Sequence, residues 1–181
     1  WHNLGRTQEM KRFTARKPLN SAELRQMALA YVARYATSRA KLAGYLRRKL
    51  AERGWDEEGA PAGEAIVEAM VAQHYVDDRA FADMKAGGLA RRGYGARRVR
   101  QALQAAGIAE EDADVALRTA EEDKLAVALA YAKRRRLGPF SSDPANMAKR
   151  EKALAAMLRA GHDYLTARQI LDLSPELVQN G

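Results

Sequence analysis

The sequence contains no cysteine, and none of its apolar runs approaches the length of a membrane-spanning segment. The lack of cysteine excludes disulfide bonds, thiolate metal sites and a cysteine nucleophile, and it suits a reducing compartment. A helix needs about 20 consecutive apolar residues to cross a bilayer, and no secretory signal pattern is present. We therefore expect a cytoplasmic protein.

The composition is otherwise that of a folded chain with a basic surface. Of the 181 residues, 47% are hydrophobic and 30% are charged, which is typical of a globular protein rather than a disordered one. A chain of this length can bury a core without disulfides or metals. The net charge is +8, with 31 Lys and Arg against 23 Asp and Glu. A polyanion is therefore the first kind of partner to consider.

An internal repeat predicts the fold class. The segments 46–55, 99–108 and 153–162 superpose without gaps, and their glycines are Gly54, Gly107 and Gly161. Glycine often ends a helix, because it adopts the left-handed conformation at little cost. Each repeat is thus expected to have a middle helix that stops at glycine, with one helix before it and one after it. No stretch alternates like a β-strand, so we predict an all-α fold, an elongated array of three tandem three-helix repeats.

Apolar spacing and capping residues place the flanking helices. First helices are expected at 21–35, 78–90 and 123–135, and third helices at 64–73, at 110–118 and around Ile170. Asn20 or Ser21, followed by Glu23, can cap the first of these helices. The expected organisation is a basic mobile arm, three repeats and a C-terminal tail, at 1–19, 20–76, 77–120, 121–173 and 174–181.

The links between helices differ in length. The insertions 59–63 and 138–144 are rich in glycine and proline and are expected to be surface loops. Between residues 109 and 136 there is neither glycine nor proline. We therefore expect one long or kinked helix to join the second and third repeats.

The charges alternate along the chain in step with the repeat. The net charge is +10 in residues 1–54, −7 in 55–84, +6 in 85–108, −6 in 109–123, +7 in 124–161 and −2 in 162–181. Every middle helix is therefore basic, and the segment after each glycine is mostly acidic. A periodic basic surface fits a phosphate backbone or a filament with its own repeat. The structural alternative is that helices commonly carry cations on their wet side and near their C-terminal ends.

Helical geometry predicts which side chains of the middle helices face inward. The expected inward residues are Leu42, Leu46 and Leu50, then Val99, Leu103 and Ala106, then Met147, Leu154 and Leu158. The outward cations, the cations that end the preceding helices and one tyrosine are the predicted contact residues for a partner. They are Arg47, Arg48, Lys49, Arg91, Arg92, Tyr94, Arg97, Arg98, Arg100, Lys133, Arg134, Arg135, Arg136, Lys149 and Lys152.

The segment Gly93-Tyr94-Gly95 precedes the second middle helix and has two interpretations. Its glycines would let a partner approach the backbone, with Tyr94 offering a stacking face. Alternatively, it is a tight turn between helices with a tyrosine in the core. It is not a phosphate-binding loop of the GxxxxGK[ST] type.

Catalytic constellations are weak in this sequence. The histidines His2, His74 and His162 lack the HxxxH spacing of a zinc site, and His162 follows a repeat glycine as a packing residue would. Four acidic groups could in principle hold magnesium as in a nuclease, but each lies at an expected helix start, where carboxylates cap the helix. These groups are Glu57-Glu58, Asp77-Asp78, 110–112 and 121–123. We therefore expect neither an enzyme nor a metal site.

Several of these segments resemble the RecX regulatory proteins of bacteria. The resemblance rests on 46–50 with Gly54-Trp55, on Tyr75-Val-Asp-Asp-Arg-Ala-Phe81, and on Ala90-Arg-Arg-Gly-Tyr-Gly95 leading into 98–103 and Gly107-Ile108. It covers residues 20–172, and the stretch 75–108 is the most specific. The insertion 59–63, the loop around Phe140 and the pair Gly87-Gly88 depart from the usual family pattern and bear on the angles between repeats.

The resemblance implies a non-catalytic modulator of the RecA recombinase in DNA repair, homologous recombination and the SOS response. Such a protein would bind RecA filaments on single-stranded DNA in the filament groove. There it would suppress filament growth, ATP hydrolysis, strand exchange and co-protease activity. The implied partner is the RecA nucleoprotein filament, with a monomeric protein, no membrane, no cofactor and no catalytic residue. Direct binding to single- or double-stranded DNA stays open, and the alternative is a general DNA-binding protein that acts through its basic helical faces.

Overall fold

The computed structural model describes residues 17–174, and the expected arm before residue 17 and the tail residues 175–181 lie outside this range. Within it the chain forms α-helices, one short 3-10 helix and an isolated bridge between Leu19 and Trp55, but no strand. The elements are α1 (Ser21–Arg34), α2 (Arg39–Arg53), α3 (Gly63–Ala72), α4 (Asp78–Arg91), α5 (Ala96–Gln104), α6 (Glu110–Glu122), α7 (Lys124–Arg135), η1 (Gly138–Phe140), α8 (Met147–Arg159) and α9 (Tyr164–Leu171). No helix in the described range is long and apolar enough to cross a membrane.

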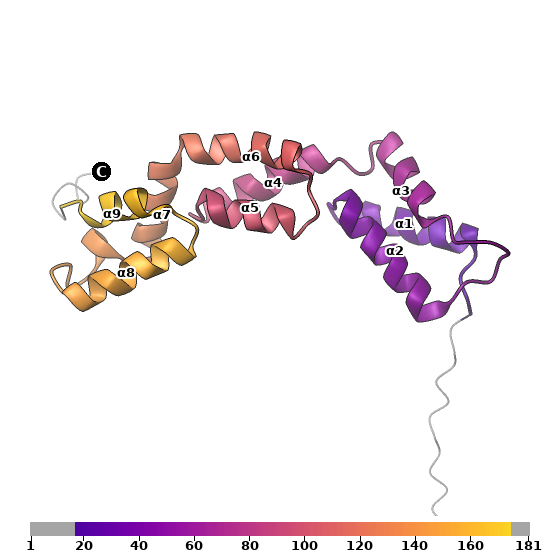
Figure 1. Cartoon of the computed structure of the whole chain (residues 1–181), viewed down its shortest axis with the longest axis horizontal. Coiled ribbons are helices and arrows are strands. Elements are labelled where there is room, and N and C mark those ends of the chain that lie inside the picture. The colour runs from indigo at the N-terminus through magenta and orange to yellow at the C-terminus, as the bar shows by residue number, and fades with distance from the viewer. Residues whose placement is uncertain (1–16, 175–181) are drawn as a thin grey trace, which may run out of the picture.

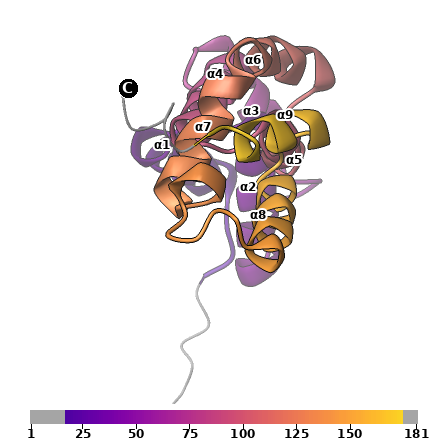
Figure 2. The same ribbon diagram turned by 90° about the vertical axis from the view of Figure 1, so that its left-hand side faces the viewer.

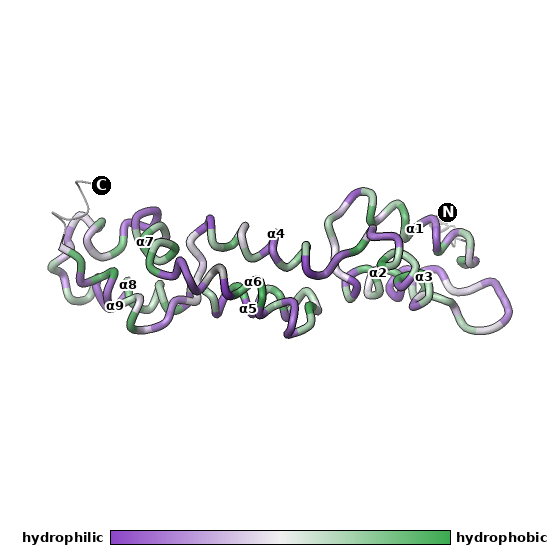
Figure 3. The backbone as a smooth tube through the Cα atoms, turned by 90° about the horizontal axis from the view of Figure 1, so that it is seen from above, coloured by the Kyte–Doolittle hydropathy of each residue, from purple (hydrophilic) through white to green (hydrophobic). Residues whose placement is uncertain are grey.

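The helices form three tandem repeats, α1–α3, α4–α6 and α7–α9, that follow one another along an elongated molecule (Figure 1). Each repeat encloses its own hydrophobic cluster. In the view turned by 90°, α7, α8 and α9 stand in front of the other two repeats (Figure 2). Green and purple segments alternate along the helices (Figure 3), as expected of amphipathic helices in small units. The all-α array of three repeats is thereby confirmed.

Capping side chains start several helices where the sequence predicts. Asn20 Oδ1 accepts a hydrogen bond from the Glu23 N–H at 2.8 Å, and the Glu23 carboxylate accepts one from the Asn20 N–H, which is a capping box. Asp77 caps α4 by accepting from the Ala80 N–H at 2.9 Å. Between the second and third repeats, α6 and α7 meet at Asp123, which confirms the expected kinked connection.

The repeat glycines end the middle helices as predicted, and two of them have a second role. Gly54, Gly107 and Gly161 have φ angles of 81°, 70° and 96°. A Cβ built on Gly107 would lie 2.3 Å from Ala40 Cβ, and one built on Gly161 would lie 2.4 Å from the backbone nitrogen of Arg98. The end of each later middle helix therefore packs directly on the beginning of the middle helix before it.

Hydrogen bonds fix these two end-to-end contacts, which we call the first and second junctions. At the first junction the buried Ser38 hydroxyl donates to the Ala106 carbonyl at 2.5 Å. At the second, the Gly95 N–H donates to the Ala160 carbonyl at 3.0 Å and the Arg97 N–H to the Gly161 carbonyl at 3.3 Å. The middle helices α8, α5 and α2 therefore lie in a row along the molecule (Figure 1).

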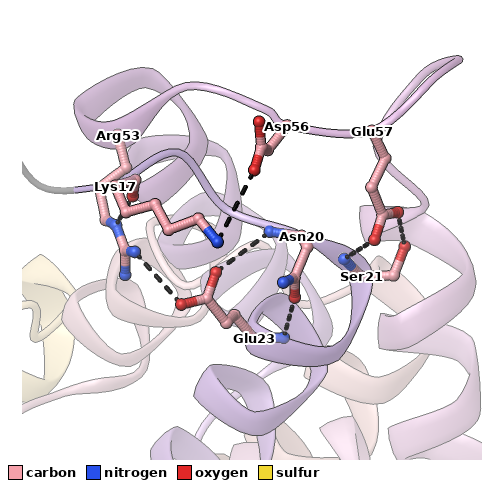
Figure 4. A network of polar contacts seen from close by, with 7 residues as sticks. All are labelled: Lys17, Asn20, Ser21, Glu23, Arg53, Asp56 and Glu57. Atoms are coloured by element: carbon pink, nitrogen blue, oxygen red, sulfur yellow. Dashed lines mark hydrogen bonds and ion pairs between the residues drawn. The ribbon is translucent and has the colours of Figure 1, made fainter.

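The C-terminal end of α2 is covered by the start of the described chain (Figure 4). The Leu19 N–H donates to the Gly54 carbonyl at 3.0 Å, and Arg53 Nε donates to the Lys17 carbonyl at 2.8 Å. Leu19 is wholly buried in the first core. The Leu19 side chain and these two hydrogen bonds therefore hold residues 17–19, the described part of the expected arm, against the first repeat.

The two insertions differ from each other. Residues 59–62 are exposed, as expected of a surface loop. In 138–144 the expectation is wrong for the first three residues: Gly138–Phe140 form a 3-10 helix, Pro139 is buried, and Phe140 packs against the third core, whereas Ser142 and Pro144 are exposed. Pro139 and the Phe140 ring fill space beside α9, where Gly138 lies against Leu171. The pair Gly87-Gly88 does not interrupt α4.

The predicted inward positions hold for the second repeat and only in part for the third, where Leu154 packs against the core but Met147 does not. Val99, Leu103 and Ala106 are buried. In α8, however, Met147 is 68% exposed, and the buried residues are Ala153 and Met157. The repeat alignment itself places Ala153 and Met157 opposite Val99 and Leu103, so the register of the repeat outweighs the size of the side chains.

Replacing Gly161 by alanine tests the second junction. We expect Gly161→Ala to lower the free energy of unfolding by more than about 1 kcal/mol, because a left-handed backbone and a backbone clash both disfavour a Cβ there. Gly59→Ala is the matched control, since Gly59 has a φ of 84° but no atom within 4 Å of the place that a Cβ would take. Urea denaturation followed by circular dichroism measures both variants. Equal losses would contradict a close contact at Gly161.

Candidate functional site

Most of the predicted contact residues are accessible to a partner. Twelve of the fifteen are exposed, and Lys49, Tyr94 and Arg100 are half-buried. Because the middle helices meet end to end, their outward cations recur along the length of the molecule. We call this set the middle-helix row: Arg47, Arg48, Arg97, Arg98, Lys149 and Lys152.

Three predicted contact cations already have carboxylate partners. Lys49 Nζ lies 2.5 Å from Glu52 Oε2, and Lys149 Nζ lies 3.2 Å from Asp143 Oδ2. The Arg100 guanidinium contacts Asp114 Oδ1 at 3.2 Å and so ties α5 to α6. Pairs of this kind on the surface contribute little to stability, because water and salt screen them, and they leave less charge for a partner.

Two further guanidinium groups hold the second junction. Arg97 Nη2 donates to the Leu158 carbonyl, and Arg134 Nη2 donates to the Arg92 carbonyl. Arginine at these positions therefore contributes to the contact between repeats as well as to the surface charge. Since a guanidinium has five N–H donors, each can still bind a second group.

The two interpretations of the 93–95 segment are resolved in favour of the turn between helices. A Cβ on Gly93 would lie 2.8 Å from Tyr131 Cβ, and one on Gly95 would lie 2.5 Å from the Gly161 carbonyl carbon. The glycines thus admit the chain's own third repeat. Tyr94 is half-buried beside Tyr131, with ring centroids 6.1 Å apart.

The remaining predicted cations have no carboxylate within 4.0 Å among residues 17–174. They are Arg47, Arg48, Arg91, Arg92, Arg98, Lys133, Arg135, Arg136 and Lys152, together with Arg97 and Arg134, which donate to backbone carbonyls. Arg136 has a left-handed φ of 53°. Its N–H donates to the Lys133 carbonyl after α7, just as the Gly93 N–H donates to the Ala90 carbonyl after α4. An arginine with a strained backbone therefore stands where glycine is favoured.

Sequence reasoning missed Lys41 and Lys85, which the fold brings together. Their Nζ atoms lie 5.2 Å and 5.8 Å from the centroid of the Phe81 ring. Burial lowers the pKa of Lys85, and the nearby Lys41 and Arg92 lower it further. The two lysines belong to different repeats, so no local pattern could have paired them.

The junctions also bury ionisable groups. His162 is 4% exposed, and its Nε2 lies 3.0 Å from the Gly93 carbonyl, which confirms the expected packing role after the glycine. Burial lowers the pKa of His162 below its usual 6.5, although the Gly93 carbonyl and Asp163 oppose this shift. At the first junction, burial raises the pKa of Asp78, whose carboxylate accepts from the Arg39 N–H at 2.8 Å.

A cleft of about 670 Å³ opens beside the second junction. Its charged lining residues are Arg97, Arg100, Lys124, Glu121 and Asp163. The acidic groups of the sequence serve local structure where their contacts are described: Glu57 accepts from the Ser21 N–H and hydroxyl, and Asp77 caps α4. No three histidine, aspartate or glutamate side chains converge as metal ligands in the described range.

Comparison with known proteins decides the family. The model of the RecX second three-helix domain matches residues 77–117. The regulatory protein RecX of Myxococcus xanthus (strain DK1622) is 34% identical over 164 residues, which cover 84% of this chain and 86% of that protein. The chain belongs to the RecX family. The regulatory protein RecX of Cronobacter sakazakii (strain ATCC BAA-894) is 38% identical over 72 residues, which cover 38% of this chain and 44% of that protein.

A solved structure agrees with the RecX assignment. The crystal structure of a regulatory protein RecX matches with a TM-score of 0.63 at 22% identity, over 84% of this chain and 74% of that chain, and it shares the fold. The RecX domain match at 77–117 spans α4, α5 and most of α6. The most specific part of the sequence resemblance lies in the same region, so the family prediction is confirmed.

The buried histidine makes the stability of this RecX protein depend on pH. Its pKa is lower in the folded state than in the unfolded state, so the unfolded chain binds more protons as the pH falls. This contribution to stability is complete above pH 6.5 and is lost as the pH falls below that value. We expect His162→Gln, which keeps an N–H donor for Gly93, to weaken the pH dependence of unfolding between about pH 8 and pH 5. His74→Gln, at an exposed position, is the control; an equal effect of both substitutions would contradict the role of His162.

Proposed function

We propose that this RecX protein is an inhibitory regulator of RecA in the cytoplasm. It binds as a monomer to RecA filaments on single-stranded DNA and suppresses their growth, ATP hydrolysis, strand exchange and co-protease activity. Membership of the RecX family supports RecA as the partner. The elongated array of repeats supports a partner that is itself periodic (Figure 1).

The observation that carries this proposal is the middle-helix row. Arg47, Arg48 and Arg98 are exposed and have no carboxylate within 4.0 Å among the described residues. They recur from α2 to α5 because the first junction places these helices end to end. Charges without internal partners attract an oppositely charged surface over a distance and orient the encounter. An acidic filament surface, DNA phosphate, or both would complete the contact.

Charge reversal in this row tests the proposal. The variant Arg47→Glu, Arg48→Glu, Arg98→Glu is expected to need at least about tenfold more protein for half-inhibition of RecA ATP hydrolysis, since like charges would then face the filament. These three are preferable to Arg97 and Arg100, which make contacts inside the protein. Circular dichroism checks that helicity is retained.

The matched control reverses three exposed arginines outside the row and changes the net charge equally. It is Arg25→Glu, Arg34→Glu, Arg118→Glu. We expect this control to inhibit RecA nearly as well as the unchanged protein. Full inhibition by the row variant, or equal loss in both variants, would contradict a specific role of the row.

The alternative function is that of a general DNA-binding protein, and the cations that end α4 and α7 favour it. Such a protein would inhibit by coating DNA before RecA assembles. Order of addition separates the two functions. The proposed regulator sediments with filaments that are already assembled and stops their ATP hydrolysis, whereas a coating protein inhibits only when it is added before RecA.

A further inference from the structure

We propose that five cations along α4 form a binding site for the phosphate backbone of a nucleic-acid strand. We call this site the α4 ridge, and its members are Lys41, Lys85, Arg91, Arg92 and Arg134. It is separate from the middle-helix row and shares no residue with it. The inference extends the proposed function to the nucleic acid of the filament, but it does not require RecA.

One end of the ridge is built across the first junction. Lys41 from α2 and Lys85 from α4 both place their Nζ atoms close to the Phe81 ring centroid, at 5.2 Å and 5.8 Å. Phe81 is buried, so the ring fixes the two ammonium groups on one side of the helix pair. No carboxylate lies within 4.0 Å of either lysine among residues 17–174. Two like charges held together without a counter-charge favour an anionic ligand.

The other end of the ridge lies at the second junction. Arg92 follows Lys85 by two helical turns and therefore lies on the same side of α4. Its Nε donates to the Gly88 carbonyl at 3.1 Å, and its own carbonyl accepts from Arg134 of α7. Arg91 folds back along the glycines, since a Cβ on Gly87 would lie 3.3 Å from its Nη1. The pair Gly87-Gly88 thus leaves room for guanidinium groups against the helix.

The length of the ridge suits a row of phosphates. Lys85 and Arg92 are seven residues apart along α4, which is about 10 Å of helix rise, and each strand of a duplex carries one phosphate per about 3.4 Å of axis. The ridge therefore faces about three phosphates of one strand. None of the five cations has a carboxylate within 4.0 Å among residues 17–174, so their charges are available to phosphates.

Salt dependence of DNA binding tests the ridge directly. Each phosphate contact to single-stranded DNA contributes about 0.7 to the slope of log K against log salt concentration. We expect the full chain to bind a single-stranded oligothymidylate, and Lys85→Gln, Arg92→Gln to reduce that slope by about 1.4. The control Arg25→Gln, Arg34→Gln removes the same charge from exposed positions outside both the ridge and the middle-helix row, and it is expected to keep the slope. Fluorescence anisotropy between about 50 and 200 mM salt, without RecA, gives all three values.

An unchanged slope in Lys85→Gln, Arg92→Gln overturns the ridge, and so does an equal loss in the Arg25 and Arg34 control. An acidic protein surface as the true ligand would give the first of these results. If the double variant does not fold, Lys41→Gln at an exposed position replaces it, with an expected loss of about 0.7. Inhibition of RecA is measured separately, so a failure of RecA regulation would not be mistaken for a failure of the ridge.

Discussion

The close contact between the end of one middle helix and the start of the one before it is the constraint on which this molecule depends. Gly107 packs against Ala40, and Gly161 packs against the backbone at Arg98, at distances that no Cβ would permit. Few other contacts could set the angle between units as narrowly, because the neighbour is backbone at Gly161 and the short Cβ of Ala40 at Gly107, and neither can rotate out of the way. The row of helices, and with it the spacing of the surface charge, follows from these two glycines.

The surface charge divides into parts with different roles. Some cations stabilise the protein itself: Arg100 ties α5 to α6, and Arg97 and Arg134 hold the second junction. Others, such as Arg47 and Arg98, have no acidic partner in the described part of the chain. A net charge of +8 does not distinguish these groups. The distinction matters for RecX function, since the unpaired cations are those that a filament or a phosphate chain can use.

The elements of the fold could be predicted because their signals are local. Asn20 with Glu23 marks a helix start, and the spacing of Gly54, Gly107 and Gly161 marks the repeat. Side-chain size was a poorer guide: Met147 is exposed although it is large and apolar, since the repeat register places Ala153 and Met157 inside. Likewise, nothing local shows that a glycine which ends a helix also meets another repeat.

The candidate site was predictable in its composition but not in its geometry. The basic helices and the RecX resemblance could be read from the residues, and the family is confirmed. The position of Lys41 beside Lys85 depends on how two repeats meet, so it required the structure. The same holds for Tyr94, which the fold places beside Tyr131 rather than on an open surface.

Inhibition of RecA ATP hydrolysis by Gly95→Ala tests most directly whether the junctions set the function. Gly95 has an ordinary φ of −73°, so alanine causes no local strain, yet its Cβ would lie 2.5 Å from the Gly161 carbonyl carbon. The second junction must open while every cation remains. The expected result is a folded protein whose concentration for half-inhibition rises about tenfold, which corresponds to a loss of about 1.4 kcal/mol of binding free energy. The control Gly44→Ala, where the Cβ would meet open space, is expected to inhibit normally. Full inhibition by folded Gly95→Ala would contradict a role for the junctions.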